Sequence, residues 1–409
     1  MSRNAVCQYL DRISFVLLCA MPLLLAVTRA GADIAVSAIA VFFLIQCALR
    51  HDFSCFKKPE LVAMLALWGY LVCQSLLLSD SSTALRSLAW LRFVLLYAAV
   101  THWLLISPPR ISLMAAITFV SVVLLLVDTY WQYFHGTSLS GRDYPHPHRL
   151  GGPMTHPNIA NLLLKLSLPL AGLWAFYLIH RGKRHEYLLF AGFVVAAMAI
   201  VPISGERSSS LLMIMATVLV MAGIFWSNHK ARWYVLATMS GFVLLMIILF
   251  MTQSVVQARA IQLAEQVINL ADSVYGQLFI AAFHFWQTSP VFGLGAGEFK
   301  YACKPAMALL HTTYCDVHPH NIYLEWLSET GTIGAALFIT AMGLVVKSVW
   351  QQRQSAPLML WLFPMVALVV VLWPAIVTQS IFSNWPAMLF WYSLSIAAAA
   401  PRYARRYVH

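Results

Sequence analysis

The residues best suited to chemistry lie in one short run, His318-Pro319-His320-Asn321, which precedes an apolar segment. Histidine titrates near neutral pH, so a positioned imidazole can take a proton from a reacting group. We expect Pro319 to occupy the first turn of a helix, where its missing N–H costs nothing. His320 then lies at the positive end of that helix, on the outer face of the membrane. The positive helix end favours the neutral imidazole. The alternative is that His320 only caps a helix at the membrane interface.

The composition places these residues in a membrane protein. The 409 residues are 61% hydrophobic and 10% charged, whereas soluble domains average ~45–50% apolar and ~25% charged residues. A soluble fold cannot bury so much apolar surface, and intrinsic disorder needs low hydrophobicity and high charge. We therefore expect an all-α polytopic membrane protein with about twelve spans, each of ~20 mostly apolar residues. The predicted spans are 13–29, 33–49, 60–78, 87–106, 111–134, 157–180, 187–204, 209–227, 232–254, 321–346, 357–377 and 386–400.

The positive charge follows from this topology. The chain has 26 basic and 15 acidic residues, for a net charge of +11. With the N-terminus inside, sixteen basic and four acidic residues fall in inner segments, a net of +12. Arg92 and Lys165 lie within spans, and the remaining residues, on the outer side, carry a net of −3. This bias follows the positive-inside rule, so we predict no nucleic-acid partner. The N-terminus resembles a signal peptide, but Thr28-Arg29-Ala30 is a poor cleavage site, so we expect an uncleaved first span and cytoplasmic termini.

Two outer loops interrupt the spans, 135–156 and 255–320. Loops of this size in a compact bundle are usually functional. Apolar residues recur at helical spacing over 255–275, which predicts an amphipathic helix on the membrane surface. We divide the chain into 1–254, with nine spans and the smaller loop; 255–320, the large periplasmic loop; and 321–409, with three spans and a basic cytoplasmic tail.

The outer segments contain two of the seven cysteines, Cys303 and Cys315. In an oxidising periplasm such a pair tends to form a disulfide, which we predict here. Nearby side chains suggest zinc but match no standard zinc spacing. The chain also lacks an Asp-x-Asp motif, so we predict no metal and no cofactor, and activity that survives chelation. The residues considered for zinc are His311, Cys315, Asp316, His318 and His320.

The spacing of His320, Asn321, Gly331 and Gly334 carries a family resemblance. This pattern resembles the motif of the O-antigen ligase and O-antigen polymerase superfamily of membrane glycosyltransferases, in which His-Asn is followed by nine residues, Gly, two residues and Gly. Independently of the resemblance, the two glycines permit close packing of a membrane helix against a neighbour. The resemblance implies a GT-C-like membrane fold.

Three further segments resemble the same family. Residues 290–299 resemble its Pro-x-x-Gly-x-Gly-x-Gly-x-Phe stretch, Arg149 to Asn158 resemble its Arg-Gly and Pro-Asn segment, and 204–208 resemble its Ser-x-x-Arg motif. With twelve spans and a large late loop, the resemblance covers most of the chain. Length and layout favour the ligase over the polymerase.

The resemblance implies a donor glycan on undecaprenyl diphosphate and an acceptor hydroxyl on lipid A–core, with membrane lipids around both. The site would face the periplasm from the bacterial inner membrane. Arginine stabilises a diphosphate leaving group by bidentate hydrogen bonds, and Arg207, near the outer end of a span, is the first candidate. The alternative is a surface ion pair with Glu206, which contributes little. His320 would be the general base of an inverting, metal-independent transfer.

Other predicted substrate contacts are less specific. The family commonly carries a second arginine before the Pro-Gly stretch, and 273–286 has none. Tyr275 or Gln277 can take that place, or Arg142 or Arg149 can supply the charge. His156 either binds phosphate or caps the next helix. The predicted substrate-binding residues are Arg142, Arg149, His156, Asn158, Tyr275, His318 and Asn321.

Two other functions remain open from the sequence. An O-antigen polymerase uses the same donor with a lipid-linked glycan as acceptor. A lipid or oligosaccharide transporter suits twelve spans, but transporters usually show repeats and helices broken near the membrane midplane. The polar residues here gather at one outer surface, which favours surface chemistry over transport.

Overall fold

The computed structural model describes residues 2–144, 149–181, 184–227, 229, 232–375 and 378–401, and for 171–191 the backbone alone. Within these residues the regular structure is helical, apart from one isolated antiparallel bridge between Thr137 and Asp143. The elements are α1 (Arg3–Val27), α2 (Arg29–Arg50), η1 (Ser54–Lys57), α3 (Pro59–Leu78), α4 (Ser81–Ala89), α5 (Leu91–Ala99), η2 (Val100–Leu104), α6 (Pro108–His135), α7 (Ile159–Arg181), α8 (Arg184–Ile203), α9 (Arg207–Ser227), α10 (Arg232–Thr252), α11 (Ser254–Ile268), α12 (Val274–Thr288), α13 (Phe299–Leu310), α14 (Ile322–Trp350), η4 (Gln351–Gln354), α15 (Leu358–Leu372) and α16 (Asn384–Ala399).

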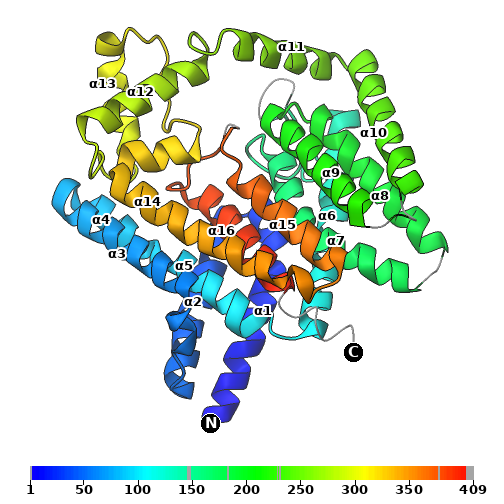
Figure 1. Cartoon of the computed structure of the whole chain (residues 1–409), viewed down its shortest axis with the longest axis horizontal. Coiled ribbons are helices and arrows are strands. Elements are labelled where there is room, and N and C mark those ends of the chain that lie inside the picture. Colours follow the sequence, from blue (N-terminus) through cyan, green and yellow to red (C-terminus); the bar gives the residue numbers. More distant parts are fainter. Residues whose placement is uncertain are drawn as a thin grey trace.

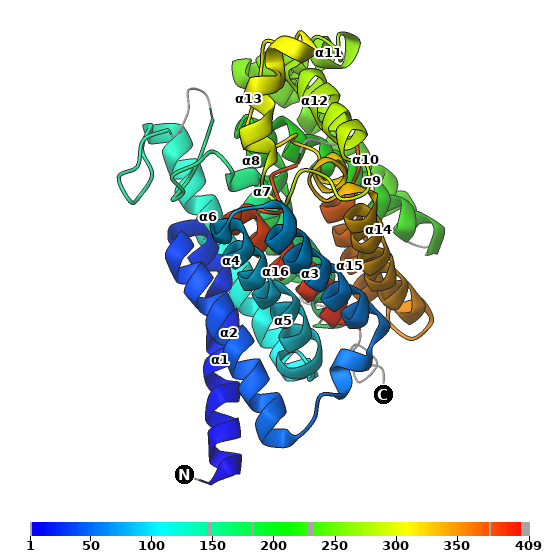
Figure 2. The same ribbon diagram turned by 90° about the vertical axis from the view of Figure 1, so that its left-hand side faces the viewer.

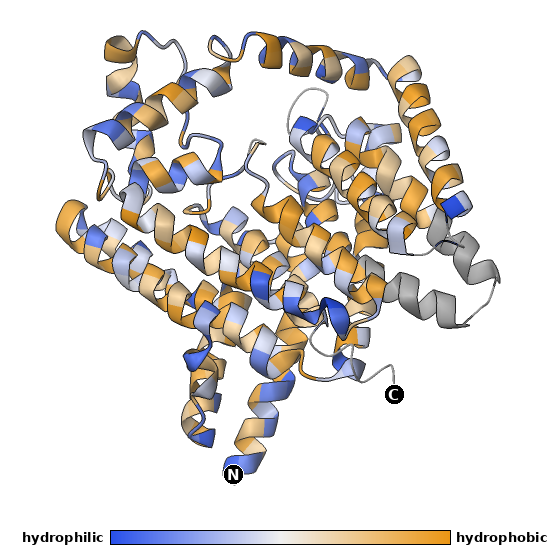
Figure 3. Ribbon diagram, viewed as in Figure 1, coloured by the Kyte–Doolittle hydropathy of each residue, from blue (hydrophilic) through white to orange (hydrophobic). Residues whose placement is uncertain are grey.

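The bundle is built from apolar helices. Eight helices in the described residues are long and apolar enough to cross a membrane, and three shorter apolar helices cover Ile159–Leu170, Gly192–Ile203 and Leu358–Leu372. Figure 3 shows apolar residues over most of the bundle, with hydrophilic residues mainly at helix ends and connections. The chain is therefore an all-α polytopic membrane protein. Part of the predicted outer loop 135–156 and the predicted basic tail after residue 401 lie outside the described residues.

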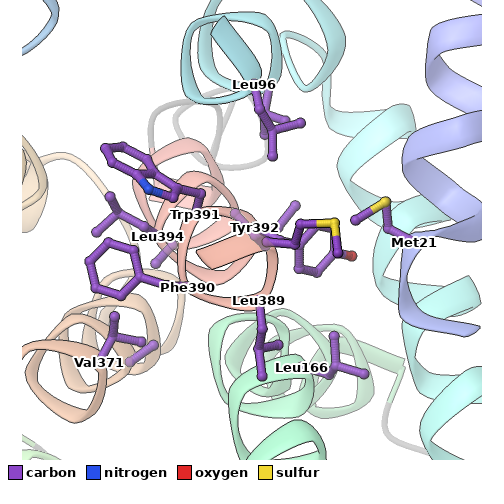
Figure 4. Close-up of a cluster of buried hydrophobic side chains, with 14 of the residues drawn as sticks. Met21, Leu96, Leu166, Val371, Leu389, Phe390, Trp391, Tyr392 and Leu394 are labelled. Carbon is purple, nitrogen blue, oxygen red and sulfur yellow. The ribbon is translucent and has the colours of Figure 1, made fainter. Parts of the chain in front are cut away.

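Helix α16 is the centre of the packed bundle, in contact with α2, α5, α7 and α15 (Figure 1). Each residue from Ala387 to Ala399 is buried, and Figure 4 shows Leu389, Trp391 and Tyr392 pointing in different directions from the helix. A helix that is apolar on all sides must be surrounded by protein or lipid. Trp90 packs edge-on against both Trp391 and Trp326, with ring centroids 5.2 and 6.1 Å apart. This contact joins the core to α14.

Helix α14 is broken at Gly331. The backbone there has φ 66° and ψ −172°, and a Cβ would lie 2.2 Å from the Val291 carbonyl oxygen. Only glycine fits such a conformation and approach. Gly334 allows close packing as expected, since a Cβ there would lie 2.9 Å from the Tyr70 ring. The predicted span over 321–346 corresponds to α14, which is long and apolar enough to cross a membrane. The sequence does not reveal the break at Gly331, because the segment that approaches the helix there is distant in the chain.

Helix α3 supplies the hydrogen bonds that the break removes. The Gln74 Nε2 group donates to the Glu329 carbonyl at 2.7 Å and also to the Phe292 carbonyl. The Tyr70 hydroxyl donates to the Thr330 carbonyl at 2.6 Å. Non-helical backbone at membrane depth is tolerated only where protein or enclosed water satisfies it. The pairing of α3 with α14 therefore fixes the N-terminal part of α14.

The glycine-rich stretch 290–299 is folded onto the same break. The Gly295 N–H donates to the Glu329 carbonyl at 2.8 Å, and the buried Glu329 carboxylate accepts from the Phe299 N–H at 3.2 Å. A Cβ at Gly293 would lie 2.5 Å from the Glu329 carbonyl carbon. This stretch therefore anchors the start of α13 to α14.

Helices α11, α12 and α13 lie together at one end of the bundle, away from the N-terminus (Figure 2). The predicted amphipathic helix over 255–275 is wrong at its C-terminal end, because α11 ends at Ile268 and Tyr275 belongs to α12. The Ser273 side chain caps α12 by accepting from the Gly276 N–H at 3.1 Å. A Cβ at Gly276 would lie 1.8 Å from the Leu270 carbonyl oxygen, so glycine is what allows the chain to turn back here.

Candidate functional site

His320 lies on the connection from α13 to α14, immediately before the helix cap. The helix begins at Ile322, and the Asn321 side chain accepts from two backbone N–H groups of the first turn, at 3.0 and 3.1 Å. Asparagine is a strong N-cap. The predicted place of Pro319 in the first helical turn is therefore wrong, although His320 does precede the helix. His320 adopts φ 56°, a left-handed conformation that is uncommon outside glycine and asparagine.

Asp316 orients the His320 ring. Its Oδ2 atom lies 3.0 Å from His320 Nε2 and accepts from the Tyr314 hydroxyl at 3.0 Å, while Oδ1 accepts from the Val317 N–H at 2.6 Å. The hydrogen bond from His320 holds the pKa of Asp316 well below its usual range. Because a carboxylate only accepts, Nε2 carries the hydrogen in the neutral ring and Nδ1 keeps its lone pair. Sequence reasoning considered Asp316 only as a metal ligand, although its position four residues before His320 was a usable signal.

The segment after α15 forms hydrogen bonds with both His318 and His320. The Thr378 N–H donates to the His320 carbonyl at 2.7 Å, and His318 Nε2 donates to the Thr378 carbonyl at 3.2 Å. His318 is 8% exposed, and its ring centroid lies 4.0 Å from that of His320. Burial, aided by the charge of His320, lowers the pKa of His318 to about 4. The same segment thus holds His318 and His320 next to each other. The Asn321 side chain also donates to the Pro374 carbonyl at 2.7 Å.

Helices α12 and α13 hold the same loop from the other side. The Gln277 side-chain oxygen accepts from the backbone N–H groups of Thr313 and Tyr314 at 2.8 and 2.9 Å. A disulfide joins Cys303 of α13 to Cys315, with Cα atoms 5.9 Å apart. Cys315 precedes the aspartate that orients His320. Gln277 therefore helps to position the loop that carries His320.

Three arginines converge near the start of α9. Arg207 is the first residue of α9, and it donates to the Gln266 side-chain oxygen at 2.6 Å and to the Tyr275 hydroxyl at 3.4 Å. Burial and the charges of Arg207 and Arg149 lower the pKa of Arg259 in α11. Arg207 and Arg259 also line one cavity, and clustered positive charge favours binding of an anion. Sequence reasoning missed Arg259, although it lies on the polar face of the amphipathic helix.

Arg149, one of the three arginines, lies in the segment 149–158. Arg149 Nη2 donates to the Pro157 carbonyl at 3.0 Å, and its buried Nε has no hydrogen-bond partner among the described residues. Asn158 precedes α7, where its carbonyl accepts from the Leu162 N–H at 3.1 Å, and His156 is exposed. Arg142 is not part of the group, since it lies in the hairpin closed by the 137–143 bridge.

Glu206 caps α7 and is not the partner of Arg207. Its carboxylate accepts from the backbone N–H groups of Ala160 and Asn161 at 2.7 and 3.1 Å and from the Ser209 hydroxyl at 2.9 Å. The residue is 6% exposed. The alternative of a simple surface pair between Glu206 and Arg207 is therefore wrong. The carboxylate at a helix N-terminus instead fixes the turn from which Arg207 projects.

Tyr275 joins the two halves of the site. Its ring packs edge-on against His320, with centroids 5.7 Å apart, and its hydroxyl receives the hydrogen bond from Arg207. Beside the arginines a cavity of about 510 Å³ runs between α9, α10 and α11. Arg207 and Arg259 line it together with apolar side chains that include Ile214, Phe242, Met246 and Phe250. Such a groove can accept an anionic group attached to a long apolar chain.

The residues once considered for zinc do not form a metal centre in the described part of the chain. Cys315 is in the disulfide and cannot act as a thiolate ligand. The described residues contain no group of three or more His, Cys, Asp and Glu side chains placed to hold a metal ion.

The comparisons with known proteins bear on these same elements. None of the curated proteins matches the chain. Residues 191–339 match the family model described as O-antigen ligase, and the match contains Arg207, Tyr275 and His320 together with Gly331 and Gly334. That family includes both ligases and polymerases. Residues 191–339 are thus similar to an O-antigen ligase family domain, and this similarity supports an enzyme of the ligase and polymerase type.

Proposed function

We propose that this protein is an O-antigen ligase that transfers O-antigen polysaccharide from undecaprenyl diphosphate to a sugar hydroxyl of lipid A–core. The contact of Tyr275 with both Arg207 and His320 carries the proposal, because it brings a phosphate-binding cation and a proton acceptor to one space. The family supports a lipid-linked sugar substrate. The acceptor and the direction of transfer are part of the proposal.

The donor lipid fits the groove beside the arginines. Its polyprenyl chain would lie along the apolar side chains of α9 and α10, and its diphosphate would meet Arg207, Arg259 and Arg149. The diphosphate is already a good leaving group, so the protein needs only to stabilise the charge that grows on it. Arginine does so without a divalent ion, and we propose a metal-independent reaction.

His320 would act as the general base. As the acceptor hydroxyl oxygen forms a bond to C1 of the donor sugar, its proton passes to His320 Nδ1. The bond from C1 to the phosphate oxygen breaks at the same time, and the diphosphate leaves with the electron pair. Asp316 holds the ring so that Nδ1 remains the acceptor. Attack opposite the leaving group inverts the anomeric centre.

The proposed topology places this chemistry in the periplasm. We propose twelve spans of a GT-C-like fold in the bacterial inner membrane, with both termini cytoplasmic. The inner segments then carry a net charge of +12 and the outer ones −3, as the positive-inside rule requires. The Cys303–Cys315 disulfide lies on the outer side in this topology, where oxidising conditions preserve it.

Reconstitution with purified lipid-linked O-antigen and lipid A–core, with and without EDTA, tests the proposal. Glycan on lipid A–core, formed equally with EDTA, supports the ligase. Longer lipid-linked glycan instead would assign the protein as a polymerase, and loss of activity in EDTA restored by Mg²⁺ would contradict metal independence. The matched control is the His320→Ala protein in the same membranes, which should form the product far more slowly.

A further inference from the structure

Two cysteines meet at the end of the bundle remote from His320. Cys47 lies in the last turn of α2 and Cys55 lies in η1, and both line one cavity of about 280 Å³. Figure 2 shows the α2 to α3 connection on the side away from α11–α13. None of these residues touches the candidate site. The proposed glycan transfer therefore assigns no role to these two cysteines.

The two thiols are placed for reaction with each other. Both side chains line the same cavity, Cys47 is 5% exposed, and Cys55 is half-buried. The hydrogen bond from Cys47 lowers the pKa of Cys55, against the opposing effect of burial. Lys58 and His102 line the same cavity. A partly accessible thiol with a lowered pKa beside a second thiol is the arrangement that favours disulfide exchange.

We propose that Cys47 and Cys55 form a dithiol redox site that low-molecular-weight disulfides, such as glutathione disulfide, convert to an intramolecular disulfide. The Cys55 thiolate attacks one sulfur of glutathione disulfide, forms a mixed disulfide and releases one glutathione thiolate. The Cys47 thiol gives up its proton and attacks the Cys55 sulfur, which releases the second glutathione. The two cysteines are oxidised by two electrons and the glutathione disulfide is reduced by two.

The other free cysteines lack such a neighbour. Cys7 and Cys19 are buried in α1, and Cys73 is exposed on α3. Cys303 and Cys315 are already joined. An oxidised thiol pair between α2 and η1 would tie together the two ends of a short connection. The site is thus a reversible modification point that is separate from the transfer chemistry.

Oxidation of the purified full-length protein in detergent tests this proposal. The protein is incubated with glutathione disulfide, free thiols are blocked with N-ethylmaleimide in denaturant, and peptides are mapped by mass spectrometry without reduction. We expect a Cys47–Cys55 linked peptide, with Cys7, Cys19 and Cys73 alkylated, and return of both thiols after dithiothreitol. A Cys55–glutathione adduct as the stable product in the wild-type protein would overturn the proposal, as would alkylation of both cysteines.

Two variants separate the roles of the thiols. In Cys47→Ser the mixed disulfide of Cys55 with glutathione should accumulate, because the second thiol is missing. In Cys73→Ser the linked peptide should form as in the wild type. If Cys47→Ser shows no more adduct than the wild type, Cys47 is not the resolving thiol and the proposal fails. The wild-type measurement decides the matter even if Cys47→Ser does not fold.

Discussion

Arg207 and His320 face the same space, but the chain places them in opposite ways. Arg207 is the first residue of a regular helix, and the adjacent Glu206 fixes that helix start by capping α7. His320 lies in a loop with a left-handed backbone, held by Asp316 and by segments distant in the sequence. Arg207 therefore projects from a regular helix, whereas the backbone of His320 is held by segments distant in the sequence. Substitutions near His320 and substitutions near Arg207 should therefore have different effects on turnover and on donor binding.

The largest effect is expected on the histidine side. His320→Ala should lower kcat by about 10²- to 10⁴-fold, the usual contribution of a general base. The KM for the lipid-linked donor should change little, because the arginines remain. Ligation assays with purified protein in membranes would measure both. His135→Ala, at the exposed outer end of α6, is the matched control, and an active His320→Ala protein would remove the base role.

On the arginine side, Arg207→Ala should lower kcat/KM for the donor by roughly 10- to 100-fold, since a hydrogen bond to a charged group contributes about 1.5–3 kcal/mol. Arg259→Ala should act in the same direction. If both bind one diphosphate, the double variant should lose less than the product of the single losses. Arg353→Ala, in η4, serves as the control. Independent, multiplicative losses would place the two arginines in separate sites.

A smaller effect is expected from Asp316→Asn. The amide can donate to His320 Nε2, which would move the ring hydrogen to Nδ1 and block the basic nitrogen. We expect kcat to fall by roughly 10-fold or more, because the wrong tautomer is favoured, with an unchanged donor KM. The exposed Asp272 provides an Asp→Asn control. A change in donor KM without a change in kcat would show that Asp316 acts on binding.

Removal of the disulfide should affect the loop that carries His320 more than the arginines near α9. Replacing Cys303 and Cys315 by serine should lower the free energy of unfolding by about 3 kcal/mol, as expected for a loop of this length. Turnover should fall while binding of the lipid-linked donor is retained, because the loop before His320 loosens and α9 does not. Thermal unfolding and donor binding would be compared with Cys73→Ser. Equal loss of donor binding would contradict the separation of the two sides.

The last prediction concerns the pH dependence of stability and not activity. The pKa of His318 is lowered to about 4 in the folded protein and is near 6.5 when unfolded. The unfolded state binds more protons between these values, so stability is complete above pH 6.5 and is lost as the pH falls toward 4. The loss from this residue is about 3 kcal/mol. His318→Gln should show a shallower fall in Tm over this range, and His135→Gln should match the wild type.

The sequence predicted the apolar helices and brought attention to Arg207, Arg149, Tyr275 and His320, because hydropathy and motif spacing are local properties. It did not predict Asp316 as the partner of His320 or Thr378 as its support. Those contacts depend on a loop geometry that no periodicity encodes. The turn at Gly276 and the break at Gly331 were missed for a related reason, since each is set by a backbone that approaches from elsewhere.

Arg259 was missed although its signal was present. The helix that carries it was predicted as amphipathic, but the sequence gives no indication of which groups its polar face meets. In the structure Arg259 interacts electrostatically with Arg207 and Arg149, so this face lies near the other two arginines. Placing a charge therefore required the packing of α11 beside α9.

The break in α14 has a consequence for how the chain is inserted into the membrane during synthesis. Until α14 reaches its partner, the carbonyl groups at Glu329 and Thr330 would face hydrocarbon unsatisfied, at a cost of several kcal/mol for each group. Tyr70 and Gln74, which satisfy them, are made more than two hundred residues earlier. α3 must therefore be in place when α14 arrives, and the order of synthesis along the chain provides this.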